Sequence, residues 1–336
     1  MRSNFDDRRT ASPTMPFKNL HINGCGNRFL AYIGIWDVLE RFYAGSALGA
    51  GETWQERVSK LEVVSGSSGG SVVALALHVG LTCAELREAV QPAVDDMRVV
   101  AHDPDIKRLM DGFGLFSTDG LRCIVQDVLA RAGLSPETTF LRLRRLMGRR
   151  FAVKVTNLSE GRTEVMDDET APDVRVCDAV VASMSVPVLF APSVINGDMY
   201  VDGDIAACTR GPGVPEESCV WFLQEGGSKK IETWADFIPA LTRSIAEFEN
   251  ERAEVVPRLA FYFRVSVPKD ALAGIDFVSA QDVTTIEGCG RAEAFRKLLP
   301  EQVALVGSIV RRVLSMRLKH SELTLLEFDA SSYPSG

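Results

Sequence analysis

The stretch LEVVSGSSGGSVVALAL, residues 61–77, decides the fold of this chain. A short apolar run, Leu61 to Ser65, leads into the glycines, and a second apolar run, Ser71 to Leu77, follows them. This order predicts a strand, a tight turn and a helix, with Ser68 at the tip of the turn. The pattern G-x-S-x-G in this setting is typical of a nucleophile elbow.

The glycines around Ser68 suit such a turn. Gly66, Gly69 and Gly70 allow backbone angles and close approaches that a side chain would block. The turn presents the serine hydroxyl, and the helix N-terminus behind it favours negative charge. Attack on a carbonyl group needs both properties. Taken alone, the same residues also fit a glycine- and serine-rich loop that joins a strand to a helix.

Composition limits the class of protein. The chain has 336 residues, of which 46% are hydrophobic and 24% charged, as in soluble globular proteins with a sizeable core. The net charge of -8 argues against general nucleic-acid binding, which needs a basic face. No apolar run approaches the roughly 20 residues of a membrane span. We therefore expect a globular protein with no transmembrane segment and no nucleic-acid partner.

The chain start and the cysteines indicate the compartment. Residues 1–16 are polar and lack the apolar stretch of a signal peptide, so we expect a disordered arm. The seven cysteines are scattered and never spaced C-x-x-C, which favours free thiols in a reducing, cytoplasmic compartment. The four histidines have no metal-ligand spacing, so we expect no zinc site.

The early chain predicts alternating strands and helices. A strand is expected over Phe17–Asn23, a glycine loop over Gly24–Arg28 and a helix over Phe29–Phe42, before the elbow strand and its helix. Such alternation implies an α/β fold with a largely parallel sheet. No shift in composition marks a domain boundary, which favours one domain with flexible ends.

The rest of the chain predicts further elements, with a helical, charged segment over residues 103–150 that includes an amphipathic helix at 119–132. The later expected elements are a strand at 151–158, a hairpin at 194–202 with an Asn196-Gly197 type I′ turn, a strand at 219–223, a helix at 231–256, a strand at 258–267, a helix at 282–298 weakened by Gly288 and Gly290, and a closing helix at 301–319.

A serine nucleophile needs a base and an oxyanion site. For the base, Asp202-Gly203-Asp204 follows the expected hairpin, where a carboxylate at a strand end can point into a cleft; an ordinary acidic turn fits as well. For the oxyanion, successive backbone N–H groups in Gly24-Cys25-Gly26-Asn27-Arg28 can form an anion-binding nest at a helix start, with Arg28 bonding the loop carbonyls. A plain tight turn is the alternative for this loop.

Taken in order, these motifs resemble the patatin-like phospholipases. The family signature combines a glycine loop followed by arginine, G-x-S-G-G at Ser68, and D-G at Asp202. Three further segments resemble the family, namely Gly114-Leu115-Phe116 with Gly120-Leu121, the strand ending in T-[DN]-L at residues 156–158, and the run ASMSVPVLFAP at residues 182–192. The resemblance covers about Phe17 to Leu299.

The resemblance implies a fold, a reaction and a division of the chain. The fold is expected to be a three-layer α/β/α sandwich formed by residues 17–299, with an amphipathic helix and flexible tail at 300–336. Ser68 would attack a fatty-acyl ester carbonyl with Asp202 as general base, and the Gly24–Arg28 loop would supply the oxyanion hole. The implied partner is a lipid substrate at a membrane or micelle surface, and no metal or other cofactor is implied.

The sequence departs from the family pattern at three places. Asp204 stands where the family has Gly or Ala, and its charge can raise the pKa of Asp202 or compete for its role. Cys25 replaces the second glycine of the loop, and its side chain disfavours positive φ. Ala206-Ala207-Cys208 replaces the usual N-x-P.

Two other functions compete with this hypothesis. Ser68, Asp202 and His320 follow the order of an α/β-hydrolase triad, but only one strand–helix unit precedes the elbow strand, and His320 ends a basic amphipathic helix. The second is a patatin-like scaffold that binds lipid or a partner without turnover. The basic stretches at 142–150 and 311–319 fit either contact with anionic headgroups or ordinary solvated helix faces.

Overall fold

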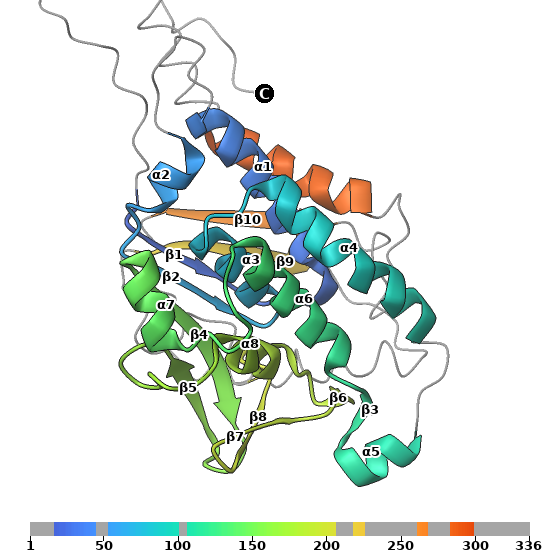
Figure 1. Cartoon of the computed structure of the whole chain (residues 1–336). Helices are drawn as coiled ribbons and strands as arrows, with labels where there is room; N and C mark the ends of the chain where they lie inside the picture. Colours follow the sequence, from blue (N-terminus) through green and yellow to red (C-terminus); the bar gives the residue numbers. More distant parts are fainter. Residues whose placement is uncertain are drawn as a thin grey trace, which may run out of the picture. The chain divides into compact units, whose positions relative to one another are not determined.

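The computed structural model describes residues 17–44, 53–100, 106–205, 218–225, 261–267 and 283–298 (Figure 1). The chain divides into two compact units, Met1–Ala294 and Phe295–Gly336, and the sheet belongs to the first. The expected arm at 1–16, the helices at 231–256 and 301–319, and His320 lie outside the described residues.

A mostly parallel sheet forms the centre of the first unit. Five strands run parallel to their neighbours in the order β10-β9-β1-β2-β4. They are β1 (Asn19–Ile22), β2 (Val63–Ser67), β4 (Arg150–Asn157), β9 (Cys219–Glu225) and β10 (Phe261–Val267). Three antiparallel strands extend the sheet beyond β4, namely β5 (Arg162–Met166), β7 (Ser193–Ile195) and β8 (Asp198–Val201).

Helices pack on this sheet as the predicted alternation requires. A short 3-10 helix η1 (Gly26–Phe29) leads into α1 (Leu30–Ala44), and α3 (Gly69–His78) follows β2 and contacts it. The other helices are α2 (Trp54–Val58), α4 (Cys83–Val100), α5 (Ile106–Gly112), α6 (Asp119–Arg131), α7 (Phe140–Met147) and α8 (Val176–Met184). Contacts link α1, α3, α4, α6 and α8 into one layer, seen in front of the sheet in Figure 1. The predicted α/β class with a mostly parallel sheet is confirmed.

The predicted hairpin is confirmed in its turn type. Asn196 and Gly197 connect β7 to β8 with φ of 54° and 96°, the two positive angles of a type I′ turn. Asp202 follows the last residue of β8, so this tight turn fixes where the acidic motif begins.

The segment predicted to be helical over residues 103–150 is not helical throughout. It contains β3 (Gly114–Phe116), which pairs with β6 (Val188–Phe190) in a separate two-stranded parallel sheet. Phe116 and Phe190 place their rings 6.2 Å apart across this pair. Strands of three residues are too short for a period-2 pattern, and this one forms through a partner more than 70 residues away in sequence.

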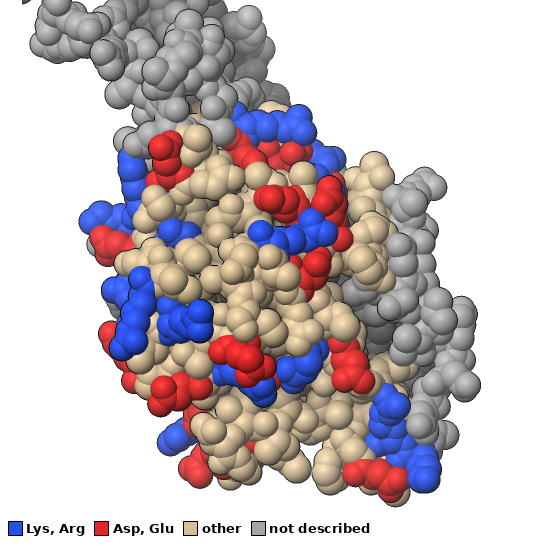
Figure 2. Space-filling view, viewed as in Figure 1, with Lys and Arg blue, Asp and Glu red and all other residues tan. Residues whose placement is uncertain are grey.

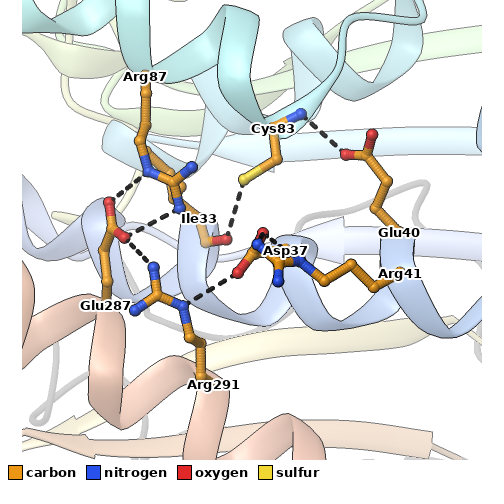
Figure 3. Close-up of polar contacts among 8 residues, drawn as sticks. All are labelled: Ile33, Asp37, Glu40, Arg41, Cys83, Arg87, Glu287 and Arg291. Carbon is orange, nitrogen blue, oxygen red and sulfur yellow. Dashed lines mark hydrogen bonds and ion pairs between the residues drawn. The ribbon is translucent and has the colours of Figure 1, made fainter.

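Ion pairs join α1, α4 and the helix of residues 283–298. Glu287 accepts from Arg87 at 2.8 and 2.9 Å and from Arg291 at 2.5 Å, and Arg291 also donates to Asp37 at 3.1 Å (Figure 3). Asp37 accepts a further hydrogen bond from Arg41 at 3.0 Å. We name these five residues the helix-face network.

Gly290 has a packing role in the helix that it was expected to weaken. A Cβ at this position would overlap the carbonyl oxygen of Ala31 on α1, whereas a Cβ on Gly288 would meet nothing within 4 Å. Gly290 therefore permits the close approach of the two helices that the helix-face network also requires.

Candidate active site

Ser68 lies at a strained turn between β2 and α3. Its φ of 46° and ψ of -136° are rare for a residue with a side chain, and strain of this kind gathers at functional sites. Ser71 stabilises the turn, because its N–H and its hydroxyl both donate to the Ser68 carbonyl, at 2.9 and 2.6 Å. The strand, turn and helix predicted around Ser68 are confirmed.

The elbow glycines allow the turn to pack against its surroundings. A Cβ on Gly66 would lie 2.7 Å from the Cα of Ser71, and one on Gly69 would lie 2.6 Å from the carbonyl oxygen of Gly26. A Cβ on Gly70 would overlap the carbonyl oxygens at the end of β1. The glycine loop after β1 and the elbow after β2 are therefore in direct contact.

Strand β4 brings Ser68 and Asp202 together. Its residues 150–154 pair with β2, ending at Ser67 opposite Lys154, while Thr156 pairs with Val201 at the end of antiparallel β8. Residues 153–157 of β4 pair with β5, so β2 and β8 both occupy the opposite edge. The two strands run towards each other along that edge, and the residue after each one lies in the gap between them.

A short hydrogen bond joins the two side chains across this gap. The Ser68 hydroxyl donates to Oδ2 of Asp202 at 2.5 Å, and both residues are buried. Oδ1 of Asp202 accepts from the N–H of Asp204 at 2.9 Å. The main chain of Asp202 is held by Ser185, whose carbonyl accepts from its N–H, and by Thr156, whose hydroxyl donates to its carbonyl. Both oxygens of the carboxylate are thus fixed in place.

Burial gives Asp202 the pKa of a base for neutral pH. Loss of solvent raises the pKa of this carboxyl to about 7, and the nearby charge of Asp204 acts in the same direction. The hydrogen bonds from Ser68 and from the Asp204 N–H, and the charge of Lys154, oppose the rise. A general base works best when its pKa lies near the working pH, so Asp202 is suited to take the proton of Ser68.

The glycine loop lies against the elbow, and its first amide group is already occupied. The N–H of Gly24 donates to Oδ2 of Asp204 at 2.6 Å and to the Ser67 hydroxyl at 3.1 Å. Within the part of the chain that the structure describes, the N–H groups of Cys25 and Gly26 have no hydrogen-bond acceptor. These two amides are therefore available to an anion.

The replacement of a glycine by Cys25 does not place a side chain at a positive φ. Cys25 has an extended φ of -162°, and the positive φ of the loop, 59°, falls on Gly26. Burial raises the pKa of the Cys25 thiol, so this group stays protonated. Asn27 and Arg28 lie in η1, where the Arg28 N–H donates to the Cys25 carbonyl at 3.2 Å.

Two residues of this site were missed by the sequence argument. The Ser183 hydroxyl accepts from the N–H of Ser68 at 2.9 Å and donates to the Lys154 carbonyl at 2.6 Å, which fixes the elbow to β4. Lys154 places its ammonium group 3.2 Å from Oδ1 of Asp204. The signals were present, since Ser183 lies in the ASMSVPVLFAP run and Lys154 is a charge within an apolar strand.

The predicted site residues that the structure describes come together around Ser68, with Gly203 and Asp204 continuing from Asp202. A Cβ on Gly203 would overlap the Lys154 carbonyl oxygen, which explains a glycine there. Among the described residues, no cluster of histidine, cysteine or acidic side chains is arranged to hold a metal ion. No described helix combines the length and apolar character of a membrane span.

Two curated viral proteins are similar to this chain. The "Probable lipid hydrolase 463L" of Invertebrate iridescent virus 6 is 23% identical over 163 residues, which are 47% of this chain and 54% of the relative. The uncharacterized protein R571 of Acanthamoeba polyphaga mimivirus is 24% identical over 145 residues, 43% of this chain and 48% of the relative. The matched region thus spans about half the length of either relative.

Two solved bacterial proteins are similar in structure. VipD of Legionella pneumophila aligns with a TM-score of 0.49 at 15% identity, over 84% of this chain and 66% of VipD. The type III effector ExoU, a protein of Pseudomonas aeruginosa, aligns with a TM-score of 0.42 at 14% identity, over 85% of this chain and 53% of ExoU.

A family model decides the assignment. The model described as "Patatin-like phospholipase" matches residues 20–207, more than half of the chain. The matched range begins in β1 and ends just after Asp204, so it contains both the elbow and the acidic motif. The chain belongs to the patatin-like phospholipase family.

Proposed function

We propose that this protein is a lipid acyl hydrolase that cleaves fatty-acyl esters through a dyad of Ser68 and Asp202. The observation that carries the proposal is the buried 2.5 Å hydrogen bond from the Ser68 hydroxyl to an Asp202 carboxyl whose pKa is raised to about 7. The name of the viral relative, a probable lipid hydrolase, and the family support a lipid ester as the substrate class.

The reaction follows from this arrangement. Asp202 takes the hydroxyl proton while the Ser68 oxygen attacks the ester carbonyl carbon, and the N–H groups of Cys25 and Gly26 receive the negative charge on the carbonyl oxygen. Protonated Asp202 then gives its proton to the departing alcohol oxygen, which leaves an acyl group on Ser68. Asp202 then takes a proton from water as the water oxygen attacks this acyl ester. Asp202 returns that proton to the Ser68 oxygen as the fatty acid leaves, which regenerates the dyad.

The place where the protein meets its substrate is part of the proposal. We propose a lipid partner at a membrane or micelle surface and a reducing compartment, in which the thiols stay free. Lys and Arg gather over α7, which supplies exposed Arg142 and Arg145 (Figure 2). However, α7 leads into the amino end of β4, whereas Asp202 lies near its carboxyl end, so this basic surface is not adjacent to the dyad.

The test combines a covalent probe with a lipid panel. Wild type, Ser68→Ala and the surface control Ser159→Ala are treated with a fluorophosphonate probe and with mixed phospholipids and acylglycerols, and the products are resolved by mass spectrometry. We expect labelling and fatty-acid release by wild type and Ser159→Ala, and the loss of both in Ser68→Ala. Lipid binding without labelling or release would instead establish the non-catalytic scaffold.

The same assay separates the dyad from a triad. We expect His320→Ala to release fatty acid within about two-fold of wild type, since the dyad does not use a histidine. Loss of turnover in a folded His320→Ala protein would establish the alternative triad of Ser68, Asp202 and His320.

A further inference from the structure

Lys154 is a buried cation next to the dyad. Only 3% of its side chain is exposed, and it lies on β4 directly opposite Ser67, the residue before the nucleophile. An ammonium group in such a place costs several kcal/mol unless a partner of opposite charge is held beside it. Hydrophobic packing alone therefore does not explain why Lys154 occupies this buried position.

Asp204 forms an ion pair with this charge, and it connects Lys154 to the glycine loop. Its Oδ1 lies 3.2 Å from the Lys154 ammonium, and its Oδ2 accepts from the Gly24 N–H at 2.6 Å. A Cβ on Gly24 would overlap this carboxylate and would lie 2.6 Å from the Cβ of Ser68. The carboxylate is therefore wedged between β4 and the loop, at the level of the nucleophile.

We propose that Lys154 is a positioning residue for hydrolysis. Its charge neutralises Asp204 and holds the Asp204 carboxylate against the Gly24 amide. This arrangement keeps the glycine loop in place and favours the ionised form of Asp202. This inference rests on the proposed function. It adds a residue with no assigned role, and it explains how the site tolerates an acidic residue where the family has glycine or alanine.

The charges around Asp202 support this role. Asp204 raises the pKa of Asp202 and Lys154 lowers it, so the two effects oppose each other. The Cys25 thiol of the loop interacts with both carboxylates and with the charge of Arg28, and this thiol stays protonated. Removing Lys154 alone leaves the charge of Asp204 uncompensated, whereas removing both charges restores the balance.

The experiment measures kcat/KM against pH for an ester substrate in the full-length protein. The acid limb of this profile is the range in which kcat/KM falls as pH decreases. Lys154→Met should move the acid limb to higher pH by about 0.5–1 unit, because Asp202 loses a neighbouring positive charge. Asp204→Asn should move it to lower pH, and the double variant should return close to wild type. Lys154→Arg, which keeps the charge, should stay nearer to wild type than Lys154→Met.

A matched control on the same strand is Arg150→Met. Arg150 pairs with Asp167 at the amino end of β4, away from the dyad, so its loss should leave the acid limb in place. An acid limb that stays put in both Lys154→Met and Asp204→Asn would overturn the proposal. If Lys154→Met does not fold, the double variant and Asp204→Asn still decide the point.

A second readout does not depend on turnover. Asp202, whose pKa is raised on folding, makes a contribution to stability that is lost as pH rises from about 4 towards 7. The Tm difference between a protein and its Asp202→Asn variant, followed against pH, reports this loss. Without Lys154, we expect the pH range over which this stability contribution is lost to extend to higher pH. An unchanged pH range would overturn the inference. If wild type shows no Ser68-dependent turnover, only the proposed function fails, and this readout still tests Lys154.

Discussion

The helix-face network and the dyad are both built from buried carboxylates, but they treat charge in opposite ways. In the network, Glu287 and Asp37 are surrounded by three arginines, Arg41, Arg87 and Arg291 (Figure 3). At the dyad, Asp202 makes no ion pair among the described residues, and the neighbouring cation Lys154 is paired with Asp204. Carboxylates that are paired with arginines hold the helices together. Asp202, which has no such pair among the described residues, keeps a raised pKa at which it can exchange a proton.

The largest effect is expected from removing the carboxylate of Asp202, which has no ion pair among the described residues. Asp202→Asn should lower kcat/KM by about 10³-fold or more with the fold intact, because no group then takes the Ser68 proton. Initial rates with an ester substrate measure the loss of turnover, and a thermal melt checks that the fold is intact. Asp198→Asn, a change on the same strand outside the dyad, is the control. Near-normal turnover in Asp202→Asn would remove the contrast between the two regions.

A pH profile sharpens the contrast without any substitution. Since the pKa of Asp202 is raised to about 7 and the proposed reaction uses its ionised form, turnover should fall as pH decreases below 7. At pH 5, two units below this pKa, about 1% of the sites hold the base form, so kcat/KM should be roughly a hundredfold below its plateau. An acid limb near pH 4 would show a carboxyl with an ordinary pKa and would contradict the raised pKa of Asp202.

A charge change in the helix-face network should affect stability and not chemistry. Glu287→Gln removes the carboxylate that pairs with Arg87 and leaves Arg291 with Asp37 as its remaining described partner. Because these arginines are about one-third exposed, we expect a loss of about 2 kcal/mol in the free energy of unfolding. Denaturant unfolding measures the loss. The acid limb of the pH profile should not move, and a shift would mean that the network acts on Asp202.

A smaller effect separates two glycines of one helix. Gly290→Ala should lower the free energy of unfolding by about 1–3 kcal/mol, because the new methyl group overlaps the Ala31 carbonyl oxygen beneath the network. Gly288→Ala faces open space and should raise stability by about 0.5–1 kcal/mol through better helix propensity. Equal effects of the two substitutions would show that packing does not distinguish them.

The parts of the molecule that local sequence determines were predictable. The elbow around Ser68 and the hairpin before Asp202 depend on turn residues that act over four or five positions. The strand β3 was missed because it forms only through pairing with β6. Lys154, Ser183 and the role of Gly290 were also missed, since each depends on residues distant in sequence, namely Asp204, Ser68 and Ala31.

The register of β4 has a mechanical consequence. Ser68 and Asp202 stand at the facing ends of two strands that are hydrogen-bonded to the same edge of β4. When the sheet flexes in thermal motion, both residues should move with β4, so we expect their separation to change little. The proton transfer that we propose between these two side chains, which lie 2.5 Å apart, should therefore be little affected by movements elsewhere in the protein.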